Sequence, residues 1–91
     1  MDFDIKKVGE VVNYWGDKMP MLVMEEAGEL IQAISKVERK EDRYLENEDL
    51  RNNLIAEIRD MYISLRALQY YYGLDTPTIE TAIHNKLNKK Y

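Results

Sequence analysis

The placement of glycine and proline is the strongest constraint on how this chain can fold. The four glycines stand at positions 9, 16, 28 and 73 and the two prolines at 20 and 77, which leaves long segments uninterrupted. Within these segments apolar residues recur with the period of an α-helix. No run alternates β-branched and polar residues as a half-buried strand does. The sequence therefore predicts an all-α chain.

We expect four helices, over roughly residues 4–14, 18–38, 48–72 and 77–90. Asp17 is the expected N-cap of the second helix, and Pro20 falls in its first turn, where a missing N–H breaks no hydrogen bond. Asn47 is the expected N-cap of the third helix. A charged connection, Arg39-Lys40-Glu41-Asp42-Arg43, separates these two long helices, which we expect to pack antiparallel.

The ends of the last two helices carry equally specific signals. Gly73 follows the third helical pattern and is expected to stop that helix. Thr76 is the expected N-cap of the fourth helix, with Pro77 at its first helical position.

Composition excludes several classes of protein. The chain has 17 acidic and 13 basic residues, a net charge of −4, and no cysteine. A non-specific nucleic-acid binder would show a basic excess, and disulfides or thiolate metal sites need cysteine. A single histidine, His84, also argues against a His-rich zinc site.

No segment reaches the roughly 20 apolar residues of a membrane span, and the first residues lack the apolar run of a secretory signal. We expect a soluble protein of the reducing cytoplasm, with no membrane and no nucleic-acid partner.

The length of 91 residues predicts one domain spanning residues 1–91. A domain this short buries only a modest part of its surface by itself. We therefore expect a small helical bundle completed by oligomerisation, as a homodimer or a homotetramer.

In the second helix, charged residues interrupt the apolar face. At about 100° per residue its apolar arc comprises Met19, Leu22, Val23, Ala27, Leu30, Ala33, Ile34 and Val37. Glu26 falls inside this arc and Glu29 at its edge, whereas Glu25 projects farther toward solvent. A carboxylate in a core direction requires a compensating cation.

The third helix repeats the acidic spacing. Its expected apolar arc comprises Leu50, Leu54, Ile58, Met61, Tyr62, Leu65, Leu68 and Tyr72. Glu57 lies at the edge of this arc and Asp60, one turn later, just outside it. Each long helix thus carries an acidic pair at i,i+3, whose members project from one flank.

Four carboxylates converge if the two long helices pack as antiparallel neighbours. Such a cluster repels itself unless a cation lies within it. Without cysteine, and with one histidine, the expected cation is a hard ion bound by oxygen, Mg²⁺ first and Mn²⁺ second. Because Mg²⁺ commonly takes further ligands from phosphates, the pattern indicates phosphate-ester or anhydride chemistry. The alternative is that these acids are ordinary surface charges.

Five other residues are candidates for binding a phosphate substrate. Lys86 and Lys90 lie on the apolar face of the fourth helix, where they either extend to solvent or bind phosphate. Lys36 shares the flank of Glu25 and Glu29. Asn53 precedes Glu57 by one turn. Trp15, at the turn before the second helix, either packs in the core or stacks on a base.

The acidic motifs resemble a known family. Glu25-Glu26-Ala27-Gly28-Glu29 followed by Glu57-Ile58-Arg59-Asp60 looks like the EExxE…ExxD pair of the MazG-like proteins, in the all-α nucleoside triphosphate pyrophosphatase superfamily. Trp15-Gly16 before the first motif is also similar. The tail Lys86-Leu87-Asn88-Lys89-Lys90-Tyr91 resembles the family's basic C-terminal segment, with Lys90 in place of a frequent arginine.

The resemblance implies an activity and a role for each acid. Proteins of this family hydrolyse nucleoside triphosphates between the α and β phosphates, giving the monophosphate and pyrophosphate. Carried over, the metal ligands are Glu26, Glu29, Glu57 and Asp60. Glu25 then either supports a ligand or acts as the base that activates water.

Two other functions remain open. The phosphoribosyl-ATP pyrophosphohydrolase of histidine synthesis shares the acidic pattern, but Asp60 is followed here by Met61-Tyr62-Ile63 rather than that branch's typical Ala-Asp-Leu context. The second is a non-catalytic, metal-binding helical dimerisation module.

Overall fold

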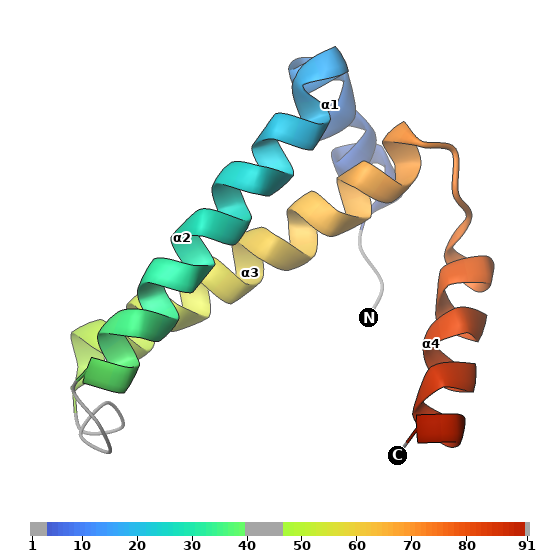
Figure 1. Cartoon of the computed structure of the whole chain (residues 1–91). Helices are drawn as coiled ribbons and strands as arrows, with labels where there is room; N and C mark the ends of the chain where they lie inside the picture. The colour runs from blue at the N-terminus through green and yellow to red at the C-terminus, as the bar shows by residue number, and fades with distance from the viewer. Residues whose placement is uncertain (1–3, 40–46, 91) are drawn as a thin grey trace.

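The computed structural model describes residues 4–39 and 47–90, and its architecture is all-α (Figure 1). Helix α1 spans Ile5–Trp15, and a 3-10 turn, η1, spans Gly16–Lys18. Helices α2, α3 and α4 span Met19–Arg39, Glu48–Tyr71 and Thr76–Lys90. These two described ranges contain no strand, which confirms the predicted fold class. Most of the expected charged connection lies outside the described residues.

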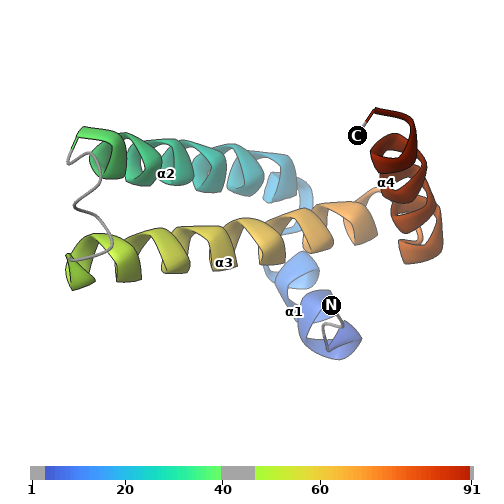
Figure 2. The ribbon, with the colours of Figure 1, turned by 90° about the horizontal axis from the view of Figure 1, so that it is seen from below.

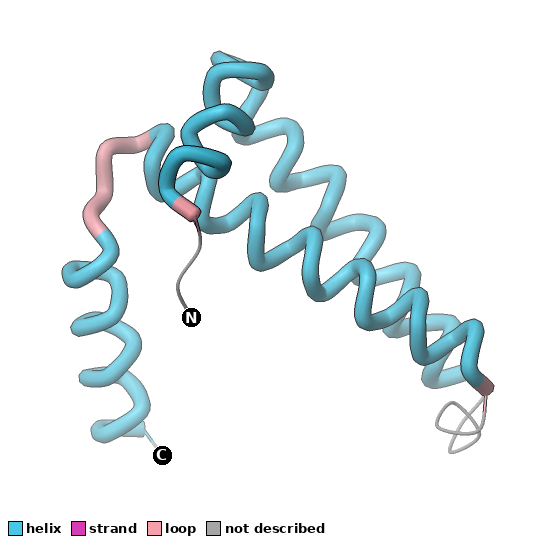
Figure 3. The backbone as a smooth tube through the Cα atoms, turned by 180° about the vertical axis from the view of Figure 1, so that it is seen from behind, coloured by secondary structure: helices cyan, strands magenta, loops and turns pink. Residues whose placement is uncertain are grey.

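Helices α2 and α3 form a long antiparallel hairpin that organises the molecule (Figure 2). Helix α1 turns back beside the last turns of α3, and α4 lies beyond the end of α3 (Figure 3). The Cα radius of gyration is 15.4 Å. A compact chain of this length would have about 12 Å, so the single chain is elongated.

Side-chain caps begin two of the helices. The backbone N–H groups of Lys6 and Lys7 donate to the Asp4 carboxylate at the start of α1. The Leu50 N–H donates to Asn47 Oδ1 over 3.1 Å, so the expected cap of α3 is confirmed. Each bond satisfies a backbone donor that has no partner inside its helix.

Gly73 ends the third helix as expected. Its φ of 70° lies in the left-handed region, which glycine adopts without strain. The Leu74 N–H then donates to the Gln69 carbonyl over 2.9 Å. This pattern closes the C-terminus of α3 and redirects the chain toward α4.

Two predicted caps are wrong. Asp17 lies inside η1, because Gly16 at φ 53° already ends α1 and starts a tight turn. Thr76 is the first residue of α4 rather than its N-cap. Its hydroxyl accepts hydrogen bonds from Arg66 and Gln69 instead, at 2.7 and 3.0 Å, and ties the start of α4 to α3.

The main hydrophobic core lies where α1, α2 and α3 meet. It consists of the buried side chains of Val8, Met19, Leu22 and Ala67, with half-buried apolar residues packed around them. Ala33 and Val37 are also buried, farther along α2.

The predicted apolar arc of α3 is wrong in part. Ile58, Tyr62, Leu65 and Tyr72 were expected to face the core but are exposed. The inward face instead follows a line of small and polar residues at spacings of four, three, four and three: Asn53, Glu57, Asp60, Ser64 and Ala67. Because Ser64 and Ala67 are small, they let the neighbouring helices approach α3 closely. The large apolar residues Ile58, Tyr62, Leu65 and Tyr72 consequently stay exposed to solvent.

Helix α4 is nearly uncovered in the single chain. It makes at most marginal contact with the other described helices, and every residue from 80 to 89 is exposed. Its apolar residues Ile83 and Leu87 are 54% and 53% exposed. Among the described helices, none combines the length and the apolar character needed to cross a membrane.

Candidate metal centre

Carboxylates from α2 and α3 meet near the middle of the hairpin. Glu26 belongs to the inward face of α2, and Glu57 and Asp60 lie on the inward line of α3. Each of these three side chains contributes one carboxylate oxygen to a cluster whose atoms all lie within 4.8 Å of one another. The structure therefore places Glu57 and Asp60 on the side of α3 that faces the other helices. The sequence had predicted Glu57 at the edge of the apolar arc and Asp60 just outside it.

Two of these carboxylates bury an oxygen that has no hydrogen-bond partner in the described part of the chain. Oε2 of Glu26 and Oε2 of Glu57 are shielded from solvent and accept no hydrogen bond within residues 4–39 and 47–90. A buried carboxylate oxygen without a partner is costly, so such atoms are rare in folded proteins. The pair therefore favours a cation as the missing partner.

The environment disfavours the ionised form of Glu26. Burial raises the pKa of its carboxyl above the ordinary value, and the negative charges of Glu29, Asp60, Glu57 and Glu25 raise it further. Every one of these causes acts in the same direction. Arg59 is the positive charge near this carboxylate among the described residues, since Glu26 and Glu57 both raise the pKa of its guanidinium, but it does not offset the burial and the negative charges that act on Glu26.

The pKa of Glu57 is also raised. Burial is the largest cause, followed by the charge of Glu29 and a hydrogen bond between the Glu29 and Glu57 side chains, with Asp60 adding to it. The positive charge of Arg59 acts in the opposite direction but does not cancel them. Glu29, the fourth predicted ligand, therefore acts on the charge of Glu57 from α2, but it is not one of the three residues whose carboxylate oxygens lie within 4.8 Å of one another.

Asp60 is the only member of the three-carboxylate cluster with an ion pair among the described residues. Arg59 Nε donates to Asp60 Oδ1 over 2.9 Å, and this contact raises the pKa of the guanidinium. Because a carboxylate has two oxygens and the bond from Arg59 uses Oδ1, Oδ2 of Asp60 can bind another partner. Arg59 can therefore orient Asp60 without occupying the whole group.

A cavity of about 280 Å³ adjoins the cluster and is walled by three helices. Glu26 and Leu22 contribute from α2, and Asp60 and Ser64 from α3. Trp15, half-buried at the end of α1, lines the same cavity. The structure thus brings an aromatic ring and two acids of the cluster to one hollow.

The other predicted site residues are distributed more widely. Asn53 is half-buried on the inward face of α3, one turn before Glu57, and Glu25 is exposed beside Glu26. Lys36 is exposed on α2. Lys86 is exposed on α4 and does not line the cavity, so one chain does not bring it to the acids. The side chain of Lys90 lies outside the described residues.

Sequence reasoning missed three residues around the site. Ser64 is buried four residues after Asp60 and donates to the Met61 carbonyl over 3.1 Å. Its spacing from Asp60 was the available signal. Ile63 and Val11 also line the cavity, and no motif pointed to them because wall residues depend on how α1 packs.

Comparison with known proteins gives no assignment. No protein-family model, curated protein or solved structure matches the chain.

The donor set of this centre fits a hard divalent cation. The candidate ligands are all carboxylate oxygens, which suit Mg²⁺ and Mn²⁺ rather than softer metals. Two of these oxygens are buried and accept no hydrogen bond from the residues that the structure describes, and the cluster joins two helices that also supply its neighbouring charges. A bound cation would neutralise the repulsion that raises the pKa values of Glu26 and Glu57.

Proposed function

We propose that this chain is a Mg²⁺-dependent nucleoside triphosphate pyrophosphohydrolase. It converts a nucleotide or deoxynucleotide triphosphate to the monophosphate and pyrophosphate, in the upkeep of the nucleotide pool. One observation supports this most strongly. Two buried carboxylate oxygens accept no hydrogen bond from residues 4–39 and 47–90, and they come one from each acidic motif, Glu26 from EExxE and Glu57 from ExxD.

The four predicted ligands are Glu26, Glu29, Glu57 and Asp60. Three of them, Glu26, Glu57 and Asp60, form the cluster within 4.8 Å, and the charge of the fourth, Glu29, raises the pKa values of Glu26 and Glu57. The resemblance of the two motifs to the MazG-like proteins supports the same four. A bound Mg²⁺ supplies Lewis acidity at the phosphate and charge neutralisation of the leaving pyrophosphate; Mn²⁺ is the second choice.

The remaining roles belong to residues around the cluster. Glu25 stays exposed beside Glu26, so it is accessible to water and can accept the proton of the attacking water. Arg59 holds one oxygen of Asp60 and so positions that carboxylate. Trp15 offers its ring as a stacking surface for the base in the adjoining cavity.

Phosphate recognition is assigned to Lys36, Asn53, Lys86 and Lys90. Of these four residues, Asn53 lies on α3, one turn before Glu57. Because Lys86 lies on the outlying α4, it can bind a substrate at this centre only from another copy of the chain. We propose that the protein works as a homodimer or homotetramer in the cytoplasm.

The test is product analysis with a matched acidic variant. The protein is incubated with Mg²⁺ and a panel of nucleoside triphosphates that includes phosphoribosyl-ATP, and pyrophosphate and orthophosphate are measured separately. We expect monophosphate and pyrophosphate, and at least about a 100-fold loss of kcat/KM in Glu57→Gln, because even residues that only support a metal ligand typically cost 10–100-fold. Glu38→Gln, exposed at the end of α2, is the control and should retain full activity.

The outcomes separate the alternatives. Turnover of phosphoribosyl-ATP alone would identify the histidine-synthesis activity. Release of orthophosphate, or activity unaffected by Glu57→Gln, would contradict the proposed chemistry. Metal binding without turnover of any nucleotide would instead support a dimerisation module, which the exposed apolar residues of α3 and α4 also favour.

A further inference from the structure

A positive charge lies at the edge of the carboxylate cluster. Arg59 directly precedes Asp60 on α3, and its Nε donates to Asp60 Oδ1 over 2.9 Å. The negative charges of all three acids of the cluster raise the pKa of its guanidinium. Arg59 is therefore electrostatically part of the candidate metal centre, although the resemblance of the acidic motifs assigns it no role.

The contact with Asp60 uses only one edge of the Arg59 guanidinium. The bond comes from Nε, and the two Nη groups donate to no group within residues 4–39 and 47–90. These two groups carry all the N–H donors of the guanidinium except the one on Nε. The side chain is 63% exposed, so these donors are open to solvent beside the centre. A planar pair of donors of this kind matches the oxygens of a phosphate.

Arg59 and the cavity of about 280 Å³ lie on different sides of Asp60. The cavity is lined on α3 by Asp60, Ile63 and Ser64, and Arg59 is not part of its wall. Along α3 the cavity thus extends from Asp60 toward the C-terminal end of the helix. Arg59 precedes Asp60, and helix side chains lean toward the N-terminus, so its guanidinium extends away from the cavity. A nucleotide with its base beside Trp15 would therefore have its outer phosphates on the Arg59 side.

The outer phosphates are also where the proposed reaction gains negative charge. Water attacks the α-phosphorus and gives its proton to the proposed base, Glu25. The bond from the α-phosphorus to the bridging oxygen breaks, and its electron pair goes to the leaving pyrophosphate. This charge develops next to three carboxylates that repel it. A guanidinium held in place by Asp60 stabilises the charge without transferring a proton.

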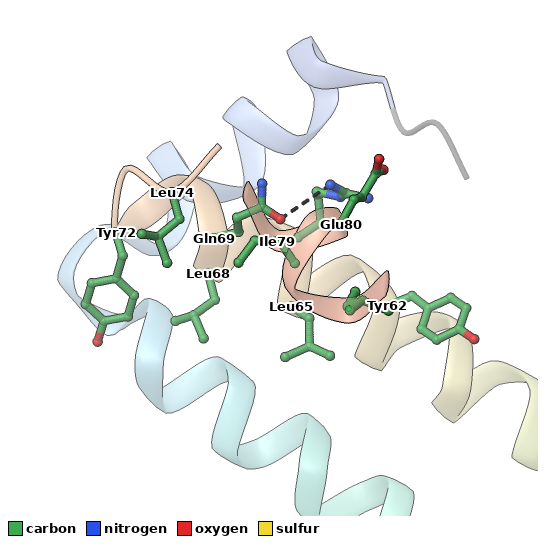
Figure 4. A pocket seen from close by; sticks show the side chains of 10 residues that line it. Tyr62, Leu65, Leu68, Gln69, Tyr72, Leu74, Ile79 and Glu80 are labelled. Carbon is green, nitrogen blue, oxygen red and sulfur yellow. Dashed lines mark hydrogen bonds between the residues drawn. The ribbon is translucent and has the colours of Figure 1, made fainter. Parts of the chain in front are cut away.

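Another arginine of α3 is engaged in a different way. A second hollow, of about 500 Å³, lies between α3 and α4, and Arg66 lines it. Its guanidinium donates to Gln69 Oε1 over 3.3 Å (Figure 4) and to the Thr76 hydroxyl over 2.7 Å. Leu65 and Leu68 belong to the mainly apolar lining of this hollow. Arg66 therefore fixes the start of α4, and the hollow between α3 and α4 does not suit a phosphate.

We propose that Arg59 binds the outer phosphates of the substrate and remains bound to the pyrophosphate as it leaves. This assignment rests on the proposed function and gives Arg59 a contact with the substrate itself. Its Nε keeps the bond to Asp60 Oδ1, and its two Nη groups donate to phosphate oxygens. Asp60 then has two roles, because Oδ1 holds the guanidinium and Oδ2 is available to a metal ion.

The test measures binding of the products, so it needs no turnover. Isothermal titration calorimetry gives the dissociation constant of Mg²⁺, and then those of inorganic pyrophosphate and a nucleoside monophosphate at saturating Mg²⁺. We expect Arg59→Gln to weaken pyrophosphate binding about 10–100-fold, the usual effect of losing hydrogen bonds between charged groups, and to leave monophosphate binding unchanged. Arg59→Lys keeps the charge but not the planar donor pair, so it should recover part of the affinity. Arg51→Gln, exposed on the same helix, is the control and should behave like the wild type.

The outcomes distinguish this assignment from the proposed function. Equal pyrophosphate affinity in Arg59→Gln and the wild type would overturn the assignment, even if nucleotides are hydrolysed, and so would a wild type that binds no pyrophosphate with Mg²⁺. A loss in Arg59→Gln that a higher Mg²⁺ concentration restores would overturn it too, because Arg59 would then only position Asp60. Pyrophosphate binding that depends on Arg59, without turnover of any nucleotide, would support the assignment and contradict the proposed hydrolysis. Circular dichroism checks folding, and we expect unchanged helicity because an exposed ion pair adds little to stability.

Discussion

Glu26 on α2 and Glu57 on α3 each bury one carboxylate oxygen that accepts no hydrogen bond from the described part of the chain. Oxygens of the two side chains lie within 4.8 Å of each other and of an Asp60 oxygen. Two like charges at this distance destabilise a fold unless a proton or a cation is shared between them. This relationship connects the proposed function to the stability of the protein.

Glu57→Gln should stabilise the metal-free protein while abolishing activity. The amide removes the negative charge that repels Glu26, Glu29 and Asp60, so the melting temperature at pH 7–8 without metal should rise. Added Mg²⁺ should then raise it less than in the wild type. Thermal unfolding followed by circular dichroism checks both points. Glu38→Gln should leave the melting temperature unchanged, and a lower melting temperature for Glu57→Gln would contradict the prediction.

Without metal, the stability of the protein should increase as the pH falls toward the ordinary glutamate pKa of 4.5. A carboxyl whose pKa is raised by folding binds its proton more tightly in the folded chain. Its contribution is therefore present at low pH and lost as the pH rises through the raised pKa values of Glu26 and Glu57. Urea unfolding at several pH values measures this, and the Glu26→Gln/Glu57→Gln double variant isolates the two groups.

Mg²⁺ should reverse this dependence. Protons and Mg²⁺ compete for the same carboxylate oxygens, so stabilisation by Mg²⁺ should be largest at high pH and should decrease as the pH falls. K⁺ at matched ionic strength controls for general screening of surface charge. Equal stabilisation by K⁺ would show that the carboxylates bind no specific divalent ion.

Trp15 should report nucleotide binding directly. It is the only tryptophan in the chain and lines the cavity with Glu26 and Asp60. We expect its fluorescence to change when a nucleotide and Mg²⁺ are added together. Trp15→Ala should raise KM about 5-fold or more, since stacking on a base contributes roughly 1–3 kcal/mol. Trp15→Phe retains an aromatic ring and should restore most of the affinity. If the KM of Trp15→Phe equals that of Trp15→Ala, the base does not stack on this ring.

Met19 should be the most sensitive single side chain in the core. It is the largest fully buried side chain and packs where α1, α2 and α3 meet. Met19→Ala should lower the free energy of unfolding by about 2–5 kcal/mol, because it leaves a cavity. Met21→Ala is the matched control, since Met21 is 58% exposed on the same helix and should change stability by about 0.5 kcal/mol or less. Urea denaturation measures both.

Local signals in the sequence determined the helices. Glycine positions, the Asn47 cap and the period of 3.6 predicted four helices and an all-α chain, because helix formation depends on contacts a few residues apart. The same period brought out Glu26, Glu29, Glu57 and Asp60, since i,i+3 spacing sets their direction on each helix. Their metal-binding role stays a prediction, although the structure gathers Glu26, Glu57 and Asp60 at one point of the hairpin.

Only the tertiary structure decided which side of α3 is buried. The sequence offered a wide apolar arc, and hydrophobicity alone placed Tyr62 and Leu65 in the core and Asp60 outside it. In the folded chain the inward side of α3 is instead the line of Glu57, Asp60, Ser64 and Ala67. The small side chains of Ser64 and Ala67 allow α2 and α1 to approach α3 closely. Burial depends on what the neighbouring helices cover, and a single chain of 91 residues has too few helices to cover both faces of α3.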